Sequence, residues 1–217
     1  MKADAELKID VEAELAWDPS VASPHVTVEV HDGVVTLGGR VASLAEKHAV
    51  VEAARRISGV RALAVELAVV LPGHEKRTDV DIAAAARQAL DWSTFVPRDQ
   101  VLAIVEGGRI TLHGEVDRQY QRAAAERAVR GLRGVTAVNN LIRLASPLNV
   151  PGIEHRIAAA LERQAPAGTP PMLTVRVDGT TVCLHGRVRS WAERDAAAEA
   201  AWSAPGVGAV VNDVVVA

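Results

Sequence analysis

Polar and apolar residues alternate in short stretches of this chain, beside turns that contain glycine. In HVTVEV, residues 25–30, the valines fall on one side of an extended backbone, whereas Thr27 and Glu29 fall on the other. A period of two predicts a β-strand with one buried face. Asp32-Gly33 follows this stretch. Because glycine accepts the positive φ of a tight turn, the alternating residues on both sides are predicted to form a β-hairpin.

The hairpin phrase occurs three times. VVTLGGRV returns as RITLHGEV and TVCLHGRV, so that Leu37, Leu112 and Leu184 are spaced 75 and 72 residues apart. Repetition of this kind indicates an array of similar structural units. We therefore predict three units, at about 5–70, 80–145 and 152–217, joined by segments 71–79 and 145–152, which contain proline and glycine.

Two helices are predicted in each unit. Before each hairpin, apolar residues recur every four positions, at Leu7, Val11, Leu15; Ile82, Ala86, Leu90; and Ile153, Ile157, Leu161. After the hairpin, Ser43 and Glu46 form a capping-box pattern, which returns at Ser190 and Glu193. The inward face of this second helix is predicted to consist mainly of small residues, at Ala49, Ala53, Ile57; Ala124, Ala128, Leu132; and Ala196, Ala200, Ala204.

A glycine and a final apolar strand close each unit. The pattern therefore predicts an α+β protein of three tandem small αββαβ units, each a three-stranded sheet covered on one face by two helices. We interpret the glycines of the repeated phrase as structural. One set turns the hairpin, and the other, Gly39, Gly114 and Gly186, leads into the second helix.

The three units resemble the BON domain family, named for bacterial osmotically induced and nodulation proteins. The similarity rests on the hairpin phrase and on the closing motif G-V-x-x-V-x-N, which ends at Asn140 and Asn212. The first unit departs from the motif, with Val65 at that position. The resemblance implies an αββαβ fold, no enzymatic activity, and binding to phospholipid or other envelope components, often under osmotic stress. Many members of the family are periplasmic.

The sequence contains no apolar stretch long enough to span a membrane. Residues 1–10 also lack the apolar core of a signal peptide. We therefore expect a cytoplasmic protein, or a periplasmic one if an export signal has been removed.

Residues that could support catalysis or bind a metal are scattered. His113 and His185 share one repeat position, where the first unit has Gly38, so we interpret them as turn-edge residues rather than metal ligands. No base is indicated for Cys183, and the glycines match no nucleotide-binding motif. We expect no catalytic residue, no metal site and no cofactor, and the protein is not expected to be an enzyme.

Positive charge is concentrated in the middle unit. The chain has a formal net charge of −3, but residues 80–145 contain nine Arg against seven Asp and Glu. Four of the nine arginines lie on an arc of the second helix that faces away from its predicted buried stripe: Arg122, Arg127, Arg130 and Arg133. The arc is either an ordinary solvated face or a site for anionic lipid headgroups or an acidic protein. Duplex nucleic acid is not expected, because the chain is net acidic and only this short arc is basic.

The outer sheet face of the middle unit is predicted to be apolar. Leu102, Ile104 and Leu141 stand where the first unit has Thr27, Glu29 and Glu66. An apolar patch of this kind marks an interface. We expect it to be buried against another unit of the chain or a second copy of the protein, with a lipid or a foreign partner as the alternative.

Two tryptophans share one repeat position near the end of the first helix. Trp17 and Trp92 each lie two residues after a core leucine, outside the buried stripe. In one interpretation the helix ends there and the indole folds over the following loop. In the other, Trp17, Trp92 and Phe95 stay partly exposed as anchors at a membrane or partner surface, with Arg122 and Arg130 supplying the attraction.

Two classes of function follow from these patterns. The first is a non-catalytic binding module for anionic phospholipid or envelope components. The second is a self-associating scaffold or small-ligand-binding stress protein in the cytoplasm.

Overall fold

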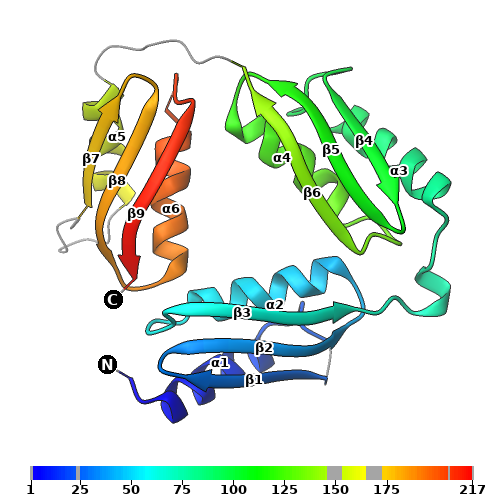
Figure 1. The fold of residues 1–217 in the computed structure, drawn as a ribbon, viewed down its shortest axis with the longest axis horizontal. Helices are drawn as coiled ribbons and strands as arrows, with labels where there is room; N and C mark the ends of the chain where they lie inside the picture. The colour runs from blue at the N-terminus through cyan, green and yellow to red at the C-terminus, as the bar shows by residue number, and fades with distance from the viewer. Residues whose placement is uncertain (1, 23–24, 146–152, 165–172, 205, 217) are drawn as a thin grey trace.

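The computed structural model describes residues 2–22, 25–145, 153–164, 173–204 and 206–216 (Figure 1). Most of the predicted joining segment 145–152, and the side chains of Ile153 and Leu161, lie outside the described part. The elements of the first unit are α1 (Asp4–Trp17), β1 (Val26–His31), β2 (Val34–Val41), α2 (Leu44–Arg56) and β3 (Ala62–Val69). A 3-10 turn, η1 (Gly73–Glu75), then leads to the second unit.

The second and third units repeat this order. They contain α3 (Asp79–Trp92), β4 (Val101–Glu106), β5 (Arg109–Val116), α4 (Gln119–Arg130), β6 (Ala137–Leu144); and α5 (Ile153–Gln164), β7 (Leu173–Asp178), β8 (Thr181–Val188), α6 (Trp191–Trp202), β9 (Ala209–Val216). The predicted fold class, an α+β protein of three repeated αββαβ units, is confirmed.

Each unit builds its own three-stranded sheet around its second strand, in the orders β1-β2-β3, β4-β5-β6 and β7-β8-β9. The hairpin strands pair antiparallel, and the third strand pairs parallel to the second. A parallel neighbour requires a crossover, which the second helix of each unit provides. In the middle unit the exposed positions alternate along β4, so one face of the sheet lacks a covering layer.

Each unit has a separate hydrophobic core between its sheet and its helices. The repeated leucines Leu37, Leu112 and Leu184 are completely buried there. Burial of one leucine side chain contributes about 1.5–3 kcal/mol. The predicted stripes of α1 and α3 are confirmed, because Leu7, Val11, Leu15 and Ile82, Ala86, Leu90 are all buried. Ile157 is buried in the third unit.

The hairpin turns are held by a carboxylate from the first helix. Asp32 and Gly33 have φ values of 50° and 77°, as the Asp-Gly turn predicts. Asp4 accepts hydrogen bonds from the backbone N–H groups of both residues, at 2.8 and 3.0 Å. Asp79 makes the same pair of contacts with the turn of the second unit. The sequence pattern had not indicated this link between helix and turn.

The second set of glycines was misplaced by the sequence analysis. Gly39, Gly114 and Gly186 lie inside the central strands, and not in the lead to the second helix. Their φ values are 108°, 144° and 143°, which side chains rarely adopt. A Cβ on Gly39 would collide with the carbonyl oxygen of His25, and one on Gly114 with that of Gln100. The glycines are therefore required where the first strand begins to pair with the central strand.

The capping-box pattern of α2 is met in part, because the Ser43 side chain accepts a hydrogen bond from the N–H of Glu46, but the Glu46 carboxylate accepts one from Ala42 rather than from the N-cap residue Ser43. The buried stripes of the second helices differ from the prediction. Val50, Ala53 and Ala54 are buried in α2, Ala124, Ala125 and Val129 in α4, and Ala197, Ala200 and Ala201 in α6. Ala49 and Ala128 are only half-buried, and Ala196 is exposed. In an alanine-rich helix, neighbouring positions have the same size and polarity, so the sequence alone did not fix the rotation.

The three units lie around a common centre, and α2, α4 and α6 occupy its inner side (Figure 1). Contacts between units come from these second helices. The start of α2 packs against the second unit through Leu44, and the start of α6 packs against the first unit through Trp191. Leu44 and Trp191 occupy the same repeat position. The two contacts between units, which we call joints, therefore use equivalent surfaces.

Candidate functional site

Trp17 and Trp92 end the first helices of their units and project into solvent. Both helices stop at these residues, since Asp18 and Ser93 are extended. The indoles are 84% and 80% exposed. The interpretation that each indole folds over the following loop is therefore wrong, because a covered ring would have lost most of its exposed surface.

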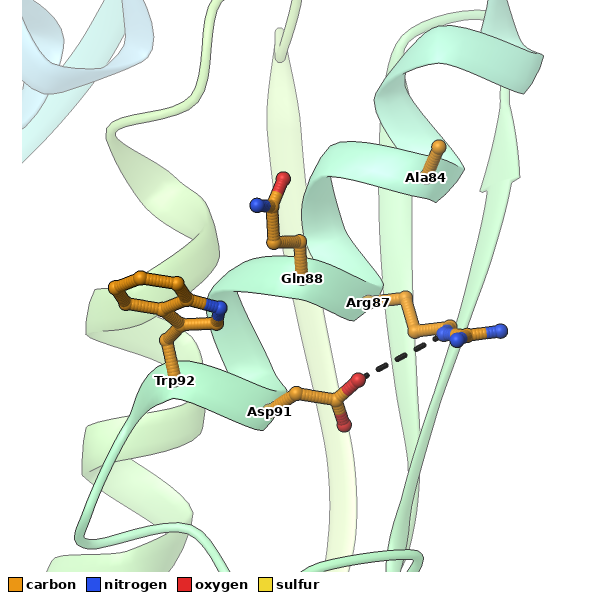
Figure 2. A pocket seen from close by; sticks show the side chains of 5 residues that line it. All are labelled: Ala84, Arg87, Gln88, Asp91 and Trp92. Atoms are coloured by element: carbon orange, nitrogen blue, oxygen red, sulfur yellow. Dashed lines mark ion pairs between the residues drawn. The ribbon is translucent and has the colours of Figure 1, made fainter.

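Two shallow hollows meet at Trp92. Figure 2 shows the first, which runs along α3 and is lined by Ala84, Arg87, Gln88, Asp91 and Trp92. The second lies beside the loop after the helix and is lined by Asp91, Trp92, Ser93, Thr94, Val96 and Arg98. We call the combined surface the Trp92 site. Trp92 lines both hollows, and each hollow also has an arginine, Arg87 on α3 and Arg98 on the following loop; Figure 2 shows that Arg87 extends to the opposite side of α3 from the indole.

The two arginines of the Trp92 site are accessible. The side chain of Arg87 is 86% exposed and lies 3.7 Å from the carboxylate of Asp91. An exposed pair of this kind contributes little stability, so Arg87 can exchange Asp91 for another anion at small cost. Arg98 is also exposed, and it lines the second hollow together with Trp92. The sequence analysis had not selected either residue, because it ranked arginines by their position on the second helix.

Phe95 lies close to Trp92 in the chain but has a different environment. It is 61% exposed, and its ring meets Tyr120 of α4 edge to face, with 6.2 Å between the ring centroids. Such a pair contributes about 0.5–1.5 kcal/mol beyond burial. The loop after α3 is therefore tied to α4 while it still presents an aromatic edge to solvent.

The carboxylates near Trp17 in the chain, Glu14 and Asp18, are already paired with Arg56. Arg56 donates hydrogen bonds to Glu14 and Asp18, both at 2.9 Å. Hydrogen bonds from the Ser20 side chain and then from Arg56 lower the pKa of Asp18 to about 2. Asp18 is therefore ionised at neutral pH. The surroundings of Trp17 favour an anionic surface less than those of Trp92 do.

The predicted basic arc of α4 is divided among different contacts. Arg130 Nη1 lies 2.9 Å from Nε2 of His48 in α2, and Arg133 lies 3.5 Å from the carboxylate of Glu75. Both arginines therefore belong to the joint between the first and second units. Burial, followed by the charge of Arg130, lowers the pKa of His48. The neutral imidazole can then accept the guanidinium hydrogen bond.

The residues equivalent to Arg122 have a structural role in the other two units. Its equivalents Lys47 and Arg194 donate hydrogen bonds to carbonyl oxygens of the third strand, at Leu67 and Val214. Arg122 is half-buried at this position, and Arg127 is exposed. The four arginines therefore do not form one free surface, because Arg130 and Arg133 are engaged with His48 and Glu75, while Arg127 is exposed.

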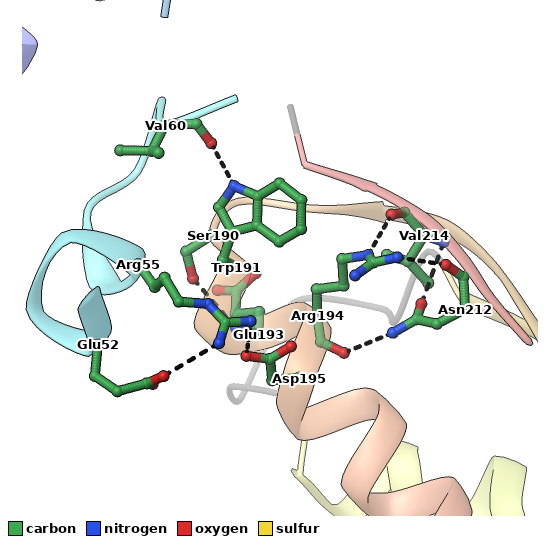
Figure 3. A network of polar contacts seen from close by, with 10 residues as sticks. All are labelled: Glu52, Arg55, Val60, Ser190, Trp191, Glu193, Arg194, Asp195, Asn212 and Val214. Carbon is green, nitrogen blue, oxygen red and sulfur yellow. Dashed lines mark hydrogen bonds and ion pairs between the residues drawn. The ribbon is translucent and has the colours of Figure 1, made fainter. Parts of the chain in front are cut away.

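The joint between the first and third units is a polar network around Trp191 (Figure 3). The indole Nε1 donates a hydrogen bond to the carbonyl oxygen of Val60, at 2.9 Å. Arg55 pairs with Asp195 across the joint and with Glu52 on its own helix. Burial raises the pKa of Asp195, while the charge of Arg55 opposes this shift. The sequence analysis missed this joint, although a tryptophan directly after a capping serine was an available signal.

The closing asparagines join strand and helix. Asn140 donates hydrogen bonds to the Arg122 carbonyl and to Glu126, both at 3.1 Å, and Asn212 donates to the Arg194 carbonyl at 3.1 Å. These contacts account for the asparagine in the closing motif. They are internal to their units, so they contribute to the fold rather than to a binding surface.

The outer sheet face of the middle unit is exposed. Leu102, Ile104 and Leu141 are 62%, 50% and 49% accessible to solvent. The expectation that another unit of the same chain buries them is wrong, because the units meet through their second helices and not through their sheets. A second copy of the protein remains a possible partner for this face.

Within the part of the chain that the structure describes, no cluster of three or more His, Cys, Asp or Glu side chains could hold a metal ion. The same residues include no helix that is both long and apolar enough to cross a bilayer. The described part of the chain is thus a tandem repeat of three αββαβ units. Its distinctive features are exposed aromatic and apolar side chains and the joints between units.

The family model of the BON domain matches residues 3–70, 78–146 and 149–217. The chain therefore belongs to the BON domain family. It is similar to the osmotically-inducible protein Y of Escherichia coli strain K12, with 29% identity over 141 residues, which cover 63% of this chain and 70% of that protein.

Two solved structures of CdsD, a structural protein of the type III secretion system of Chlamydia trachomatis, were also matched. One has 16% identity and a TM-score of 0.26, with 97% of this chain and 92% of that chain covered. The other, of the C-terminal domain, has 15% identity and a TM-score of 0.28, with both chains fully covered.

Proposed function

We propose that this protein is a non-catalytic binding module that docks on anionic phospholipid surfaces through the Trp92 site. The observation that carries the proposal is the 80% exposed indole of Trp92, which lies between hollows lined by Arg87 and Arg98. An indole has an apolar body and a polar N–H, and this combination suits the boundary between lipid tails and headgroups.

The two arginines supply the electrostatic part of the proposed contact. A guanidinium group can donate paired hydrogen bonds to one phosphate, and each basic residue near an anionic membrane contributes about 1 kcal/mol. Phe95 and Thr94 extend the contact along the loop that follows α3, where both side chains are exposed. A single site of this size predicts weak and reversible binding.

The relationship to a protein that is osmotically inducible supports a role in stress. Family membership supports a binding rather than a catalytic role. We propose that the protein acts during osmotic stress by associating with membrane phospholipid.

Co-sedimentation with vesicles tests this function. Vesicles that contain phosphatidylglycerol should bind the protein, and vesicles of phosphatidylcholine alone should bind it much less. Binding should weaken as salt is added, because salt screens exposed charges beyond a Debye length of about 10 Å at 0.1 M. Equal binding to both kinds of vesicle, or no binding to either at low salt, would contradict the proposal.

A second candidate function is self-association, favoured by the exposed apolar face of the middle sheet. Self-association through this face needs no membrane.

A further inference from the structure

The bare face of the middle sheet has an ordered arrangement of side chains. Strand register places Leu102, His113 and Leu141 in one row across the sheet. The adjacent row contains Ile104, Thr111 and Asn139. The apolar side chains therefore lie on the two outer strands, β4 and β6, with Thr111 and His113 of β5 between them. We call this surface the β4-β5-β6 face.

The residues at the equivalent positions of the other units are polar. In place of Leu102, Ile104 and Leu141, the first unit has Thr27, Glu29 and Glu66, and the third has Thr174, Arg176 and Asp213. The three sheets share one backbone arrangement, so the fold does not require apolar residues here. The third unit exposes Val211 and Val215 on the same face, but on its third strand only. An exposed apolar first strand, with Leu102 and Ile104, is therefore particular to the middle unit and needs a cause outside the fold.

Charged residues mark the two ends of the central strand on this face. Arg109 precedes the apolar rows and Glu115 follows them, and both side chains are exposed. The first and third units have Val34 and Thr181 at the position of Arg109, and arginines, Arg40 and Arg187, at the position of Glu115. A positive and a negative end on the central strand therefore occur only in the middle unit.

We propose that the β4-β5-β6 face binds the same face of a second copy, to give a two-fold symmetric dimer. A two-fold axis that lies between the sheets and perpendicular to β5 makes the two central strands antiparallel. Arg109 of each chain then faces Glu115 of the other. The same operation sets Ile104 of each chain against Leu102 of the other, and Leu141 of each chain against Asn139 of the other. Opposite charges therefore meet at both ends of β5, and apolar side chains meet over β4.

The alternative symmetric arrangement is unfavourable. A two-fold axis parallel to β5 would set Arg109 against Arg109 and Glu115 against Glu115, and like charges in direct contact across an interface are repulsive. Sheets that pack face to face are about 10 Å apart, with strands rotated by about 30°. That spacing suits leucine and isoleucine side chains from both partners.

A second copy fits this face better than a membrane does. The charges that flank the apolar rows are mixed, because Glu106 lies beside Arg109 at one end and Glu115 beside Arg143 at the other. Anionic headgroups would meet a carboxylate at each end, whereas a second copy can offer an opposite charge to each. The face also lies on the opposite side of the sheet from α3, whose Ile82, Ala86 and Leu90 are buried against it. Trp92 is therefore left free in the dimer, and dimer formation and vesicle binding can be measured separately.

Sedimentation velocity of the full chain over a wide concentration range provides the first test. We expect a monomer–dimer equilibrium for the wild-type protein, and loss of the dimer for Ile104→Asp. Val80→Asp is the matched control, since Val80 is 78% exposed on α3, away from this face. Both variants should melt like the wild type. A wild-type protein that stays monomeric throughout, or an Ile104→Asp variant that still dimerises, would overturn the proposal.

Exchange of charges provides the second test. Arg109→Glu and Glu115→Arg alone should each raise the dimer dissociation constant about tenfold or more, because each places like charges in contact. The double variant Arg109→Glu/Glu115→Arg should dimerise again. An equimolar mixture of the two single variants should also form a heterodimer. Failure of both the double variant and the mixture to dimerise would exclude this pairing of Arg109 with Glu115.

Discussion

Trp191 donates its indole hydrogen bond to the carbonyl oxygen of Val60, a residue 131 positions earlier in the chain. The contact joins the third unit to the first and places an aromatic ring against the core of the first unit. Arg194 lies above the same ring, with its guanidinium carbon 5.1 Å from the centroid. The third unit thus contributes a side chain to the packing of a unit from which it is distant in sequence.

Replacement of Trp191 should therefore weaken the first unit as well as the third. Trp191→Phe keeps the aromatic body but removes the donor, which should cost about 0.5–1.5 kcal/mol. Trp191→Ala also removes partly buried ring surface and should cost more, about 2 kcal/mol or above. Urea unfolding of the three proteins measures these differences. If Trp191→Phe is as stable as the wild type, the hydrogen bond to Val60 does not hold the joint.

The contact between His48 and Arg130 makes the joint of the first and second units sensitive to pH. Burial and the charge of Arg130 lower the pKa of His48 below its ordinary value of 6.5. The unfolded chain therefore binds a proton more readily than the folded chain does. The contribution of neutral His48 to stability is fully present above pH 6.5. It should decrease as the pH falls below that value, and level off below the pKa of the folded protein.

Thermal melts of the wild type and His48→Gln between about pH 8 and pH 5 test this expectation. Stability of the wild type should fall more steeply with acidification than that of His48→Gln, which cannot become protonated. His31→Gln is the matched control, because the side chain of His31 is 91% exposed. An identical pH profile for the wild type and His48→Gln would show that this histidine does not govern the joint.

Gly114 should be intolerant of any side chain. Its φ of 144° and the carbonyl oxygen of Gln100 both oppose a Cβ, so Gly114→Ala should cost at least about 1–3 kcal/mol in backbone strain alone. Gly131→Ala is the control, since a Cβ there would meet nothing within 4 Å, and it should change stability by no more than about 0.5 kcal/mol. Urea unfolding compares the two. Similar stabilities would remove the structural explanation for the glycine in the repeated phrase.

The fold could be predicted from the sequence because its signals are local and repeated. The β-hairpin is specified by the alternation around Asp32-Gly33, and the first helix by the spacing of Leu7, Val11 and Leu15. The same patterns occur in all three units, so each copy supports the prediction for the others. The rotation of α6 was less certain, because Ala196 and Ala197 are chemically identical and only packing distinguishes them. The position of Gly114 was missed because a positive φ inside a strand has no signature beyond the glycine itself.

The candidate site was harder to predict, because it depends on how units meet. The helical periodicity predicted that the arginines of α4 share one side of the helix. It could not show that Arg130 contacts His48 of another unit. Arg87 and Arg98 come from a helix and a loop, so no single period relates them to Trp92. The exposure of Leu102 is also a property of the assembled units, since the sequence alone did not show which faces the joints would use.

The most direct test of the account is a vesicle titration of Trp92→Ala, with Trp17→Ala as the matched control. The two tryptophans share one repeat position, and Trp92 is 80% and Trp17 84% exposed. Trp92 lines hollows that also contain Arg87 and Arg98, whereas Arg56, near the end of α1, is paired with Glu14 and Asp18. With vesicles that contain phosphatidylglycerol, Trp92→Ala should bind about tenfold more weakly than the wild type, a loss of roughly 1.4 kcal/mol. Its melting temperature should be unchanged, and Trp17→Ala should bind nearly as well as the wild type. If Trp92→Ala instead lowers the melting temperature and leaves vesicle binding intact, Trp92 is a packing residue and the proposed membrane contact is wrong.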